Sequence, residues 1–176
     1  MSPKHGPGFR LNNIYWLWIS AAIILLDQVT KQLVVRNLLW FESVPVMPHF
    51  NLVYLKNTGA AFSMLSDAPP LFFILLGVGV SLGIMWWLRK HPNEQHLVAA
   101  ALALILGGAL GNVIDRATRG FVVDFIDFYV GSWHFAAFNV ADIAISTGAG
   151  LLILDMILDT LRQRKAQKAA AKSAEE

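Results

Sequence analysis

The chain has 176 residues, enough for one domain, and 56% of them are hydrophobic while only 15% are charged. Its mean hydropathy of +0.52 excludes an ordinary soluble domain, and its six Trp and eleven Phe fit a membrane protein with aromatic side chains at the interfaces. Because the chain has no cysteine, disulfides, thiolate nucleophiles and cysteine metal sites are excluded as well.

Four apolar stretches are long enough to cross a bilayer, which takes about 20 residues. Polar residues from Asp27 to Lys31 interrupt the first stretch, so Ile14–Leu26 could instead be the apolar part of a cleaved signal peptide. We favour an uncleaved membrane helix, because the apolar pattern resumes at Leu33 and three further stretches follow. The four predicted spans cover about residues 14–35, 71–88, 97–114 and 141–158.

The two longer connections, 37–70 and 115–137, contain many apolar residues, which favours small folded elements over open loops. In the first connection, prolines break helices and Phe50–Leu55 is a plausible short strand. In the second, β-prone runs before and after Gly131-Ser132 predict a hairpin. These two runs are Phe121–Val130 and Trp133–Phe138.

Lys and Arg in short flanking segments predict the orientation in the membrane. They occur before the first span, at Arg89 and Lys90, and in the basic tail 162–176, whereas the two longer connections carry few of them. Both termini are therefore expected in the cytoplasm and both connections outside. The tail is read as a solvated segment near anionic lipid, helical or disordered, and its lack of aromatic residues disfavours nucleic-acid binding.

This orientation brings the polar residues of three spans to one side of the membrane. They are Asp27, Lys31, Asn112, Asp115, Asn139 and Asp142. The segment between the last two spans adds Asp124 and Asp127, and carboxylates beside hydrocarbon usually face an interior site. This convergence is the strongest physical indication of a functional site.

The chemistry that remains open to this cluster is carboxylate chemistry. Two carboxylates in one site hold a single proton between them, so they can activate water and protonate a leaving group without a cofactor. The five histidines are scattered and none has a partner at metal-ligand spacing, so neither a metal nor another cofactor is expected. We hypothesise that Asp124 and Asp142 form a catalytic pair.

Structural interpretations of the same residues stay open. Asp27 and Lys31 are four residues apart and can neutralise each other within one helix. We favour an interfacial ion pair for Asp115-Arg116 and a solvated loop position for Asp127. Asp142 can equally be an early-turn acid that the helix dipole favours. The three asparagines can cap turns or helix ends, or hold a substrate backbone; they are Asn57, Asn112 and Asn139.

Five ordered blocks of the chain resemble those of the bacterial lipoprotein signal peptidase family, also called signal peptidase II. The similarity extends from about Ile14 to Leu158. The blocks are Asp27-Gln28-Val29-Thr30-Lys31, Asn57-Thr58-Gly59-Ala60-Ala61-Phe62-Ser63, Gly107-Gly108-Ala109-Leu110-Gly111-Asn112-Val113-Ile114-Asp115-Arg116, Val123-Asp124-Phe125-Ile126-Asp127 and Phe138-Asn139-Val140-Ala141-Asp142.

The resemblance implies an intramembrane aspartyl endopeptidase of the bacterial inner membrane, with its active site near the periplasmic leaflet. It implies diacylglyceryl-modified prolipoproteins as substrates, cleavage just before the lipidated cysteine, a small β cradle, a mobile lid, and inhibition by globomycin. Membrane phospholipid is the expected surrounding partner, and we expect a monomer. The family's catalytic acids fall on Asp124 and Asp142, and its supporting residues on Asp27, Asn57, Asn112, Asp115, Arg116 and Asn139.

Two other classes of protein could place acids in a helix bundle. A transporter or proton relay would use them along a crossing path, but here they cluster on one side and no internal repeat is evident. A membrane scaffold would use them as structural ion pairs and would tolerate Asp124→Asn. Proton flux into liposomes without peptide cleavage would favour the transporter.

Overall fold

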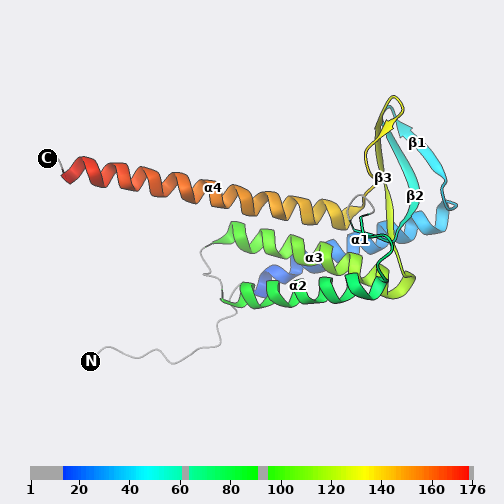
Figure 1. Cartoon of the computed structure of the whole chain (residues 1–176), viewed down its shortest axis with the longest axis horizontal. Coiled ribbons are helices and arrows are strands. Elements are labelled where there is room, and N and C mark those ends of the chain that lie inside the picture. Colours follow the sequence, from blue (N-terminus) through cyan, green and yellow to red (C-terminus); the bar gives the residue numbers. More distant parts are fainter. Residues whose placement is uncertain (1–13, 61–63, 91–94, 175–176) are drawn as a thin grey trace.

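The computed structural model describes residues 14–60, 64–90 and 95–174. Its helices run side by side in a bundle and its strands gather at one end of that bundle (Figure 1). In chain order the elements are the 3-10 helix Ile14–Trp16, α1 (Leu17–Asn37), β1 (Ser43–Met47), β2 (Phe50–Asn57), α2 (Pro70–Lys90), α3 (His96–Arg119), β3 (Val122–Val130), β4 (Trp133–His134) and α4 (Val140–Ala174).

Four helical segments are long and apolar enough to cross a membrane, which confirms the predicted mainly α membrane fold with a small β region. They are Ile14–Asn37, Pro70–Lys90, His96–Arg119 and Val140–Lys168. In three of these segments no more than 22% of the most apolar 18-residue stretch is buried, against 50% in α3. Helix α3 is therefore the central helix, and it packs against the other three.

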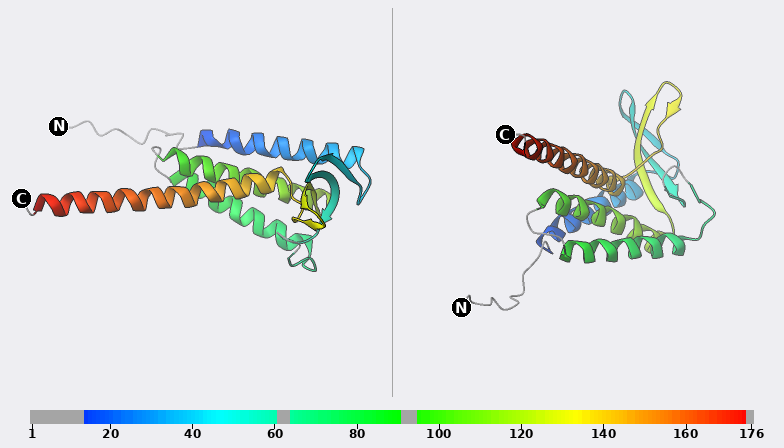
Figure 2. Two further views of the ribbon diagram at one scale, coloured as in Figure 1. Left: turned by 90° about the horizontal axis from the view of Figure 1, so that it is seen from above. Right: turned by 60° about the vertical axis from the view of Figure 1, so that its left-hand side comes forward.

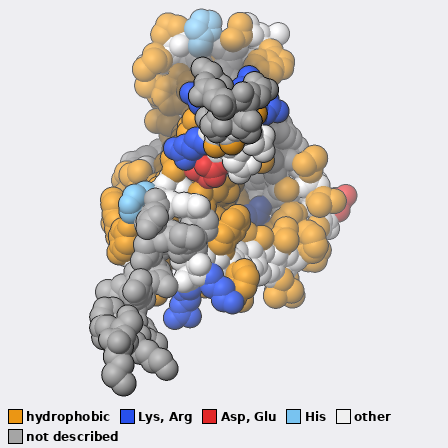
Figure 3. All heavy atoms as spheres, turned by 90° about the vertical axis from the view of Figure 1, so that its left-hand side faces the viewer, with side chains coloured by type: hydrophobic (Ala, Val, Ile, Leu, Met, Phe, Trp, Pro, Cys, Tyr) orange, Lys and Arg blue, Asp and Glu red, His pale blue; other side chains and the backbone are white. Residues whose placement is uncertain are grey.

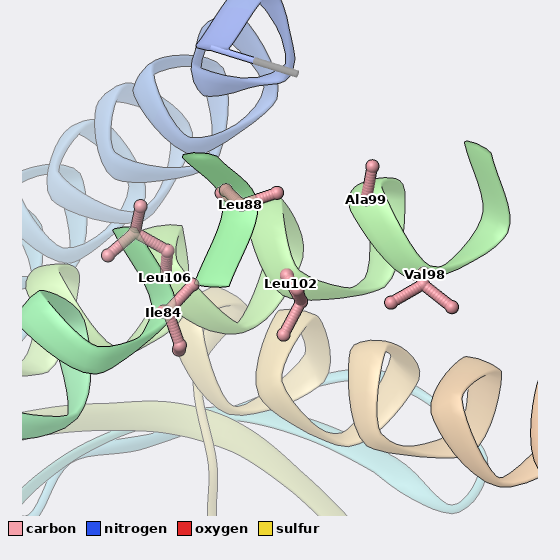
Figure 4. Close-up of a cluster of buried hydrophobic side chains, with 6 residues drawn as sticks. All are labelled: Ile84, Leu88, Val98, Ala99, Leu102 and Leu106. Carbon is pink, nitrogen blue, oxygen red and sulfur yellow. The ribbon is translucent and has the colours of Figure 1, made fainter. Parts of the chain in front are cut away.

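The core at the far end of the bundle from the sheet is formed by aliphatic side chains of α2 and α3 (Figure 4). It consists of Ile84, Leu88, Val98, Ala99, Leu102 and Leu106. Closer to the sheet, glycines of α3 let neighbouring helices approach. A Cβ at Gly111 would lie 2.7 Å from the Asp27 Oδ2 atom, so only glycine leaves room for that carboxylate.

The sheet has the order β1-β2-β3-β4, with antiparallel neighbours, and its strands run across the helix axes (Figures 1 and 2). Side chains of β2 and β3 pack on the end of α1 in a second cluster of Val34, Tyr54, Val123 and Phe125. The predicted strand at Phe50–Leu55 and the hairpin around Gly131, whose φ is 62°, are confirmed.

Three element boundaries differ from the sequence prediction. Strand β1 was missed because Pro45 indicated a break, but an edge strand tolerates proline. The prediction that Asp115 and Arg116 lie in a connecting segment is wrong, because α3 continues to Arg119 and ends at Gly120 with a φ of 81°. Helix α4 runs through the basic tail as far as Ala174, so of the two alternatives for the tail, helical or disordered, the helical one is correct over this range.

Candidate active site

Asp124 and Asp142 lie at the junction of the sheet and the bundle, one on β3 and one in the first turn of α4. Asp124 is only 4% exposed. Asn139, the residue before α4, contacts both acids: its Nδ2 donates to Asp124 Oδ1 over 2.7 Å, and its backbone N–H donates to Asp142 Oδ2 over 3.2 Å. The chain therefore brings the two predicted acids into one site, which we call the acid pair.

Asparagine side chains hold the remaining carboxylate oxygens. Asn57 Nδ2 donates to Asp124 Oδ2 over 3.0 Å, and Asn112 Nδ2 donates to Asp142 Oδ1 over 2.9 Å. All three predicted asparagines thus contact the acid pair, from β2, from α3 and from the residue before α4. Donors on each carboxylate fix its orientation and stabilise its ionised form.

Asn139 and Asp142 also form a reciprocal cap at the start of α4. The Asp142 N–H donates to Asn139 Oδ1 over 3.0 Å, while Asp142 Oδ2 accepts the Asn139 N–H. This is the pattern of a capping box, with an acid three residues into the helix. The early-turn interpretation of Asp142 therefore holds together with its place in the acid pair, and the cap fixes the carboxylate relative to the helix axis.

Behind the acid pair lies an ion cluster, formed by Asp27, Lys31, Asp115 and Arg119. The Lys31 Nζ atom is 2.9 Å from Asp27 Oδ2 and 3.0 Å from Asp115 Oδ2, and all three side chains are fully buried. Arg119 pairs with the other oxygen of Asp115. Two acids and two cations balance, which is what makes such burial tolerable.

The predicted pair of Asp27 and Lys31 is confirmed, whereas the predicted pair of Asp115 with Arg116 is wrong. Side chains one residue apart point to different sides of a helix, while those four apart meet. Asp115 therefore pairs with Arg119, and Arg116 points to the other side.

Arg116 joins α3 to the segment after β2. Its Nη2 donates to the Gly59 carbonyl over 2.5 Å, and its guanidinium lies 4.7 Å from the centre of the Phe73 ring. This contact places Gly59, and with it Asn57, beside the acid pair. The expected lid belongs to the two outer segments, 37–70 and 115–137, and residues 61–63 of the first one lie outside the described residues.

Two cavities meet at the acid pair. One, of about 700 Å³, lies between α2, α3 and α4; its walls are mainly apolar, and Asp142 and Arg116 line it at one end. The other, of about 560 Å³, lies along the sheet and is lined by Asp124 and polar neighbours. Asn57 and residues 135–137 line both. One carboxylate thus faces an apolar space and the other a more polar one.

Comparison with known proteins identifies the family. A family model described as "Signal peptidase (SPase) II" matches residues 19–158. The chain belongs to the signal peptidase II family. Proteins named lipoprotein signal peptidase are 51% identical over 147 residues in Pasteurella multocida, covering 82% of this chain and 89% of that protein, and 49% identical over 158 residues in Haemophilus influenzae, covering 88% of each.

A solved structure described as a bacterial membrane enzyme has the same fold. It aligns with a TM-score of 0.77 at 31% sequence identity, covering 90% of this chain and 94% of that one. A second structure with the same description gives a TM-score of 0.72 and covers 88% and 97%. Membership of the signal peptidase II family makes this chain an aspartic-type peptidase.

Asp127, an acid close to the site, occupies a different environment from the one predicted. It was predicted to be a solvated loop residue, but it is 6% exposed, accepts a hydrogen bond from Asn51 Nδ2 over 2.9 Å, and lies 3.0 Å from His134 Nδ1. The prediction is wrong because of a bulge in β3: the N–H groups of Phe125 and Ile126 both donate to the Phe138 carbonyl.

That bulge inserts one extra residue, so side chains on either side of it share a face. Asp124 and Asp127 consequently line the same cavity. Two partners of Asp127, Asn51 and His134, were not among the residues predicted for the site. The only sequence signal for Asn51 is a single amide within a predicted apolar strand. No local sequence pattern marks the bulge, so nothing in the sequence indicated that His134 pairs with Asp127.

In this peptidase, burial raises the pKa of the Asp124 carboxyl from its ordinary value to about 7, and the charge of Asp142 acts in the same direction. Hydrogen bonds from Asn57 and Asn139 oppose this rise in pKa. At neutral pH the site can therefore hold a proton at Asp124. Among residues 14–60, 64–90 and 95–174, no group of three or more His, Cys, Asp or Glu side chains could hold a metal ion.

Proposed function

We propose that this protein is an intramembrane endopeptidase that removes signal peptides from diacylglyceryl-modified prolipoproteins, cutting just before the lipidated cysteine. The observation that carries the proposal is the acid pair: two carboxylates from separate elements, joined through Asn139, at the meeting point of an apolar and a polar cavity. Family membership supports the reaction class, and the names of the relatives support the substrate class.

In the proposed mechanism the acid pair shares one proton and titrates as a unit. The ionised carboxylate takes a proton from a water molecule, and the resulting hydroxide attacks the carbonyl carbon of the scissile peptide bond. The protonated carboxyl donates to the carbonyl oxygen as negative charge develops there. When the carbon–nitrogen bond breaks, a proton from the acid pair passes to the leaving amine, and the new acid and amine are released.

The raised pKa of Asp124 supports it as the proton holder at the start, with Asp142 as the ionised partner that activates water. Asn57, Asn112 and Asn139 act as positioning residues, since each donates to one of the carboxylates. Arg116 holds the segment after β2 against the site through Gly59.

The cavity between the helices suits the apolar signal segment of a substrate, while the lipid of the modified cysteine stays in the bilayer. Its walls are side chains of three membrane-crossing helices, with Phe73, Leu76, Val80, Ile105 and Ile145 among them. An apolar segment that enters from the bilayer would reach the acid pair at the end of this cavity. The cavity along the sheet then receives the chain on the other side of the cut.

The orientation also belongs to this proposal. Arg89, Lys90 and the basic residues of α4 lie at the end of the bundle away from the sheet, which supports cytoplasmic termini and a site near the periplasmic leaflet of the inner membrane. Membrane phospholipid surrounds the exposed helix faces, and globomycin-type inhibitors are expected to block the acid pair.

The decisive experiment is cleavage of a synthetic lipobox peptide carrying a diacylglyceryl cysteine by the purified protein in detergent. We expect a cut just before the modified cysteine, no cut in the unmodified peptide, and loss of cleavage in Asp124→Asn and Asp142→Asn. Asp159→Asn, at an exposed position of α4 paired with Arg162, is the matched control and should cleave normally. An active Asp142→Asn protein would refute the acid pair.

A further inference from the structure

The outer part of the sheet has an unusual composition. It consists of residues 43–50, which hold β1 and the turn after it, and residues 128–135, which hold the end of β3, the hairpin turn and β4. We call these two segments together the arm. Neither contains a Lys, Arg, Asp or Glu, in a part of the protein that lies outside the four apolar helices.

Large apolar side chains of the arm are exposed. Met47 is 58% exposed, Val130 66% and Trp133 63%, and Val44, Val46 and Phe128 add to the same surface. Single exposed apolar residues are common, but a continuous group of them without charges marks a surface that binds protein or membrane.

The position of the arm favours the membrane. The arm projects sideways from the end of the bundle, at a steep angle to the helix axes (Figures 1 and 2). If the four helices cross a bilayer, the arm therefore lies along its surface. Figure 3 looks from the end of the bundle opposite the sheet, and hydrophobic side chains cover much of the arm's visible face, at the top. This face is turned back toward the lipid that surrounds the helices.

We propose that the arm rests on the outer leaflet and inserts Met47, Val130 and Trp133 into the interface between headgroups and acyl chains. Tryptophan and uncharged apolar residues are the side chains that this interface favours. A specific protein partner would be fixed in register by charged or hydrogen-bonding groups at the rim, and the arm has no charged ones. Helix α4 also exposes an apolar side chain in its first turn, where Ile143 is 45% exposed.

Membrane contact by the arm would fix the height of the acid pair above the acyl chains. Strand β3 runs from Asp124 into the arm at Phe128, so the arm and the carboxylate lie on one strand. The proposal rests on the proposed orientation of the helices and not on the proposed chemistry, so inactive protein can be used to test it.

The absence of cysteine makes the test simple, because a single introduced cysteine can carry a nitroxide spin label. We would label Met47→Cys and Val130→Cys separately, in lipid nanodiscs that hold one copy of the protein and no substrate. Leu75→Cys on the exposed face of α2 is the lipid-facing reference, and Lys168→Cys near the end of α4 is the water-facing reference. For each label we would compare how strongly two agents enhance the relaxation of the nitroxide spin. Oxygen is concentrated in lipid, whereas a water-soluble nickel chelate stays outside it.

We expect both arm labels to favour oxygen over nickel, with values between those of the two references and closer to Leu75→Cys. Adding Trp133→Asp to the Val130→Cys protein should shift that label toward the water-facing value. Nickel access equal to that of Lys168→Cys would overturn the proposal. Protection that appears only in discs with two copies, or only with substrate, would also overturn it and would assign the arm to a protein partner. Loss of peptidase activity alone would leave these outcomes unchanged.

Discussion

Lys31 and Asp142 are joined through one amide. The Lys31 ammonium donates to Asn112 Oδ1 over 2.9 Å, and Nδ2 of the same side chain donates to Asp142 Oδ1 over 2.9 Å. The charge of the ion cluster thereby fixes which atom of Asn112 faces the carboxylate, since an ammonium requires the oxygen. A fully buried cation thus orients a donor toward one member of the acid pair.

The ion cluster also holds the backbone beside both acids. Asp115 Oδ2 accepts the N–H of Val123 over 3.0 Å, and Asp27 Oδ1 accepts the N–H of Ala141 over 2.9 Å. Val123 and Ala141 immediately precede Asp124 and Asp142. The ion cluster therefore holds the start of β3 and the start of α4 in place from inside the bundle, although these two segments are distant in sequence.

Replacing the central cation should disrupt this arrangement. Lys31→Met leaves Asp27 and Asp115 with only Arg119 as a cation, and breaking a buried ion pair from one side costs about 3–5 kcal/mol. We expect a clear fall in the thermal unfolding temperature in detergent and loss of peptide cleavage. Lys165→Met, on the exposed part of α4, is the matched control and should change neither. A Lys31→Met protein as stable as the control would mean that the ion cluster does not support the fold.

The two roles of Asn139 can be separated by one substitution. Asn139→Ser keeps a side-chain oxygen that can cap α4 but removes the amide that donates to Asp124. A hydrogen bond to a charged group contributes about 1.5–3 kcal/mol, and Asp124 becomes charged when it gives up its proton during the reaction. We therefore expect cleavage to slow by about 10- to 100-fold with little loss of stability.

The pH profile is the readout that a purely structural role of Asn139 would not move. The amide lowers the pKa of Asp124, so loss of the amide should raise that pKa. The part of the curve of cleavage rate against pH that depends on this carboxyl should then move to higher pH. A slower enzyme with an unshifted profile would indicate that Asn139 acts only by capping the helix.

The raised pKa of Asp124 also has a consequence for stability. Between about pH 4, its ordinary pKa, and about pH 7, the folded carboxyl holds a proton that the unfolded chain has released. Its contribution to the free energy of unfolding therefore falls as pH rises through this window. Asp124→Asn does not ionise, so its unfolding temperature relative to wild type should increase from pH 5 to pH 8. A constant difference across this range would contradict the raised pKa.

The sequence predicted the four helices, the hairpin and most of the site because these depend on local patterns. Apolar length predicts a span, and β-prone runs around Gly131 predict a turn. The spacing of Asp27 and Lys31 predicts a contact within one helix turn. The grouping of polar residues at one end of the bundle followed from the orientation alone.

The remaining features depend on contacts between segments that are distant in sequence. The pairing of Asp115 with Lys31 requires α1 and α3 to pack side by side, which glycine at position 111 permits. The burial of Asp127 requires the β3 bulge, which no local pattern indicates. Strand β1 exists because β2 offers it an edge, and its proline, Pro45, would disfavour a central strand.

A pair of glycine substitutions tests the close packing behind the site. Gly111→Ala would place a methyl group 2.7 Å from Asp27 Oδ2, so the ion cluster would have to shift. A Cβ at Gly79 on α2 meets nothing within 4 Å, so Gly79→Ala should be neutral or stabilise the helix by up to about 1 kcal/mol. We expect Gly111→Ala to lower the unfolding temperature and the cleavage rate and Gly79→Ala to lower neither. Equal effects would indicate that the ion cluster relaxes without cost.

Asp127 provides the sharpest distinction between an acid that positions the sheet and an acid that takes part in the reaction. It shares a cavity with Asp124, yet its partners are Asn51 and His134 and not the asparagines of the acid pair. Asp127→Asn keeps an oxygen that can accept the Asn51 amide, so we expect cleavage within a few-fold of wild type. Asp127→Ala leaves that amide buried without an acceptor, which costs about 1–3 kcal/mol in stability.

Cleavage rates and unfolding temperatures of the two Asp127 variants should therefore be measured beside those of Asp124→Asn. Our assignment requires that Asp124→Asn is folded and inactive, Asp127→Asn is folded and active, and Asp127→Ala is active but less stable. If a folded Asp127→Asn protein failed to cleave the lipid-modified peptide, the reacting carboxylates would have to include Asp127. The proton sharing proposed for Asp124 and Asp142 would then have to be replaced by a three-carboxylate site.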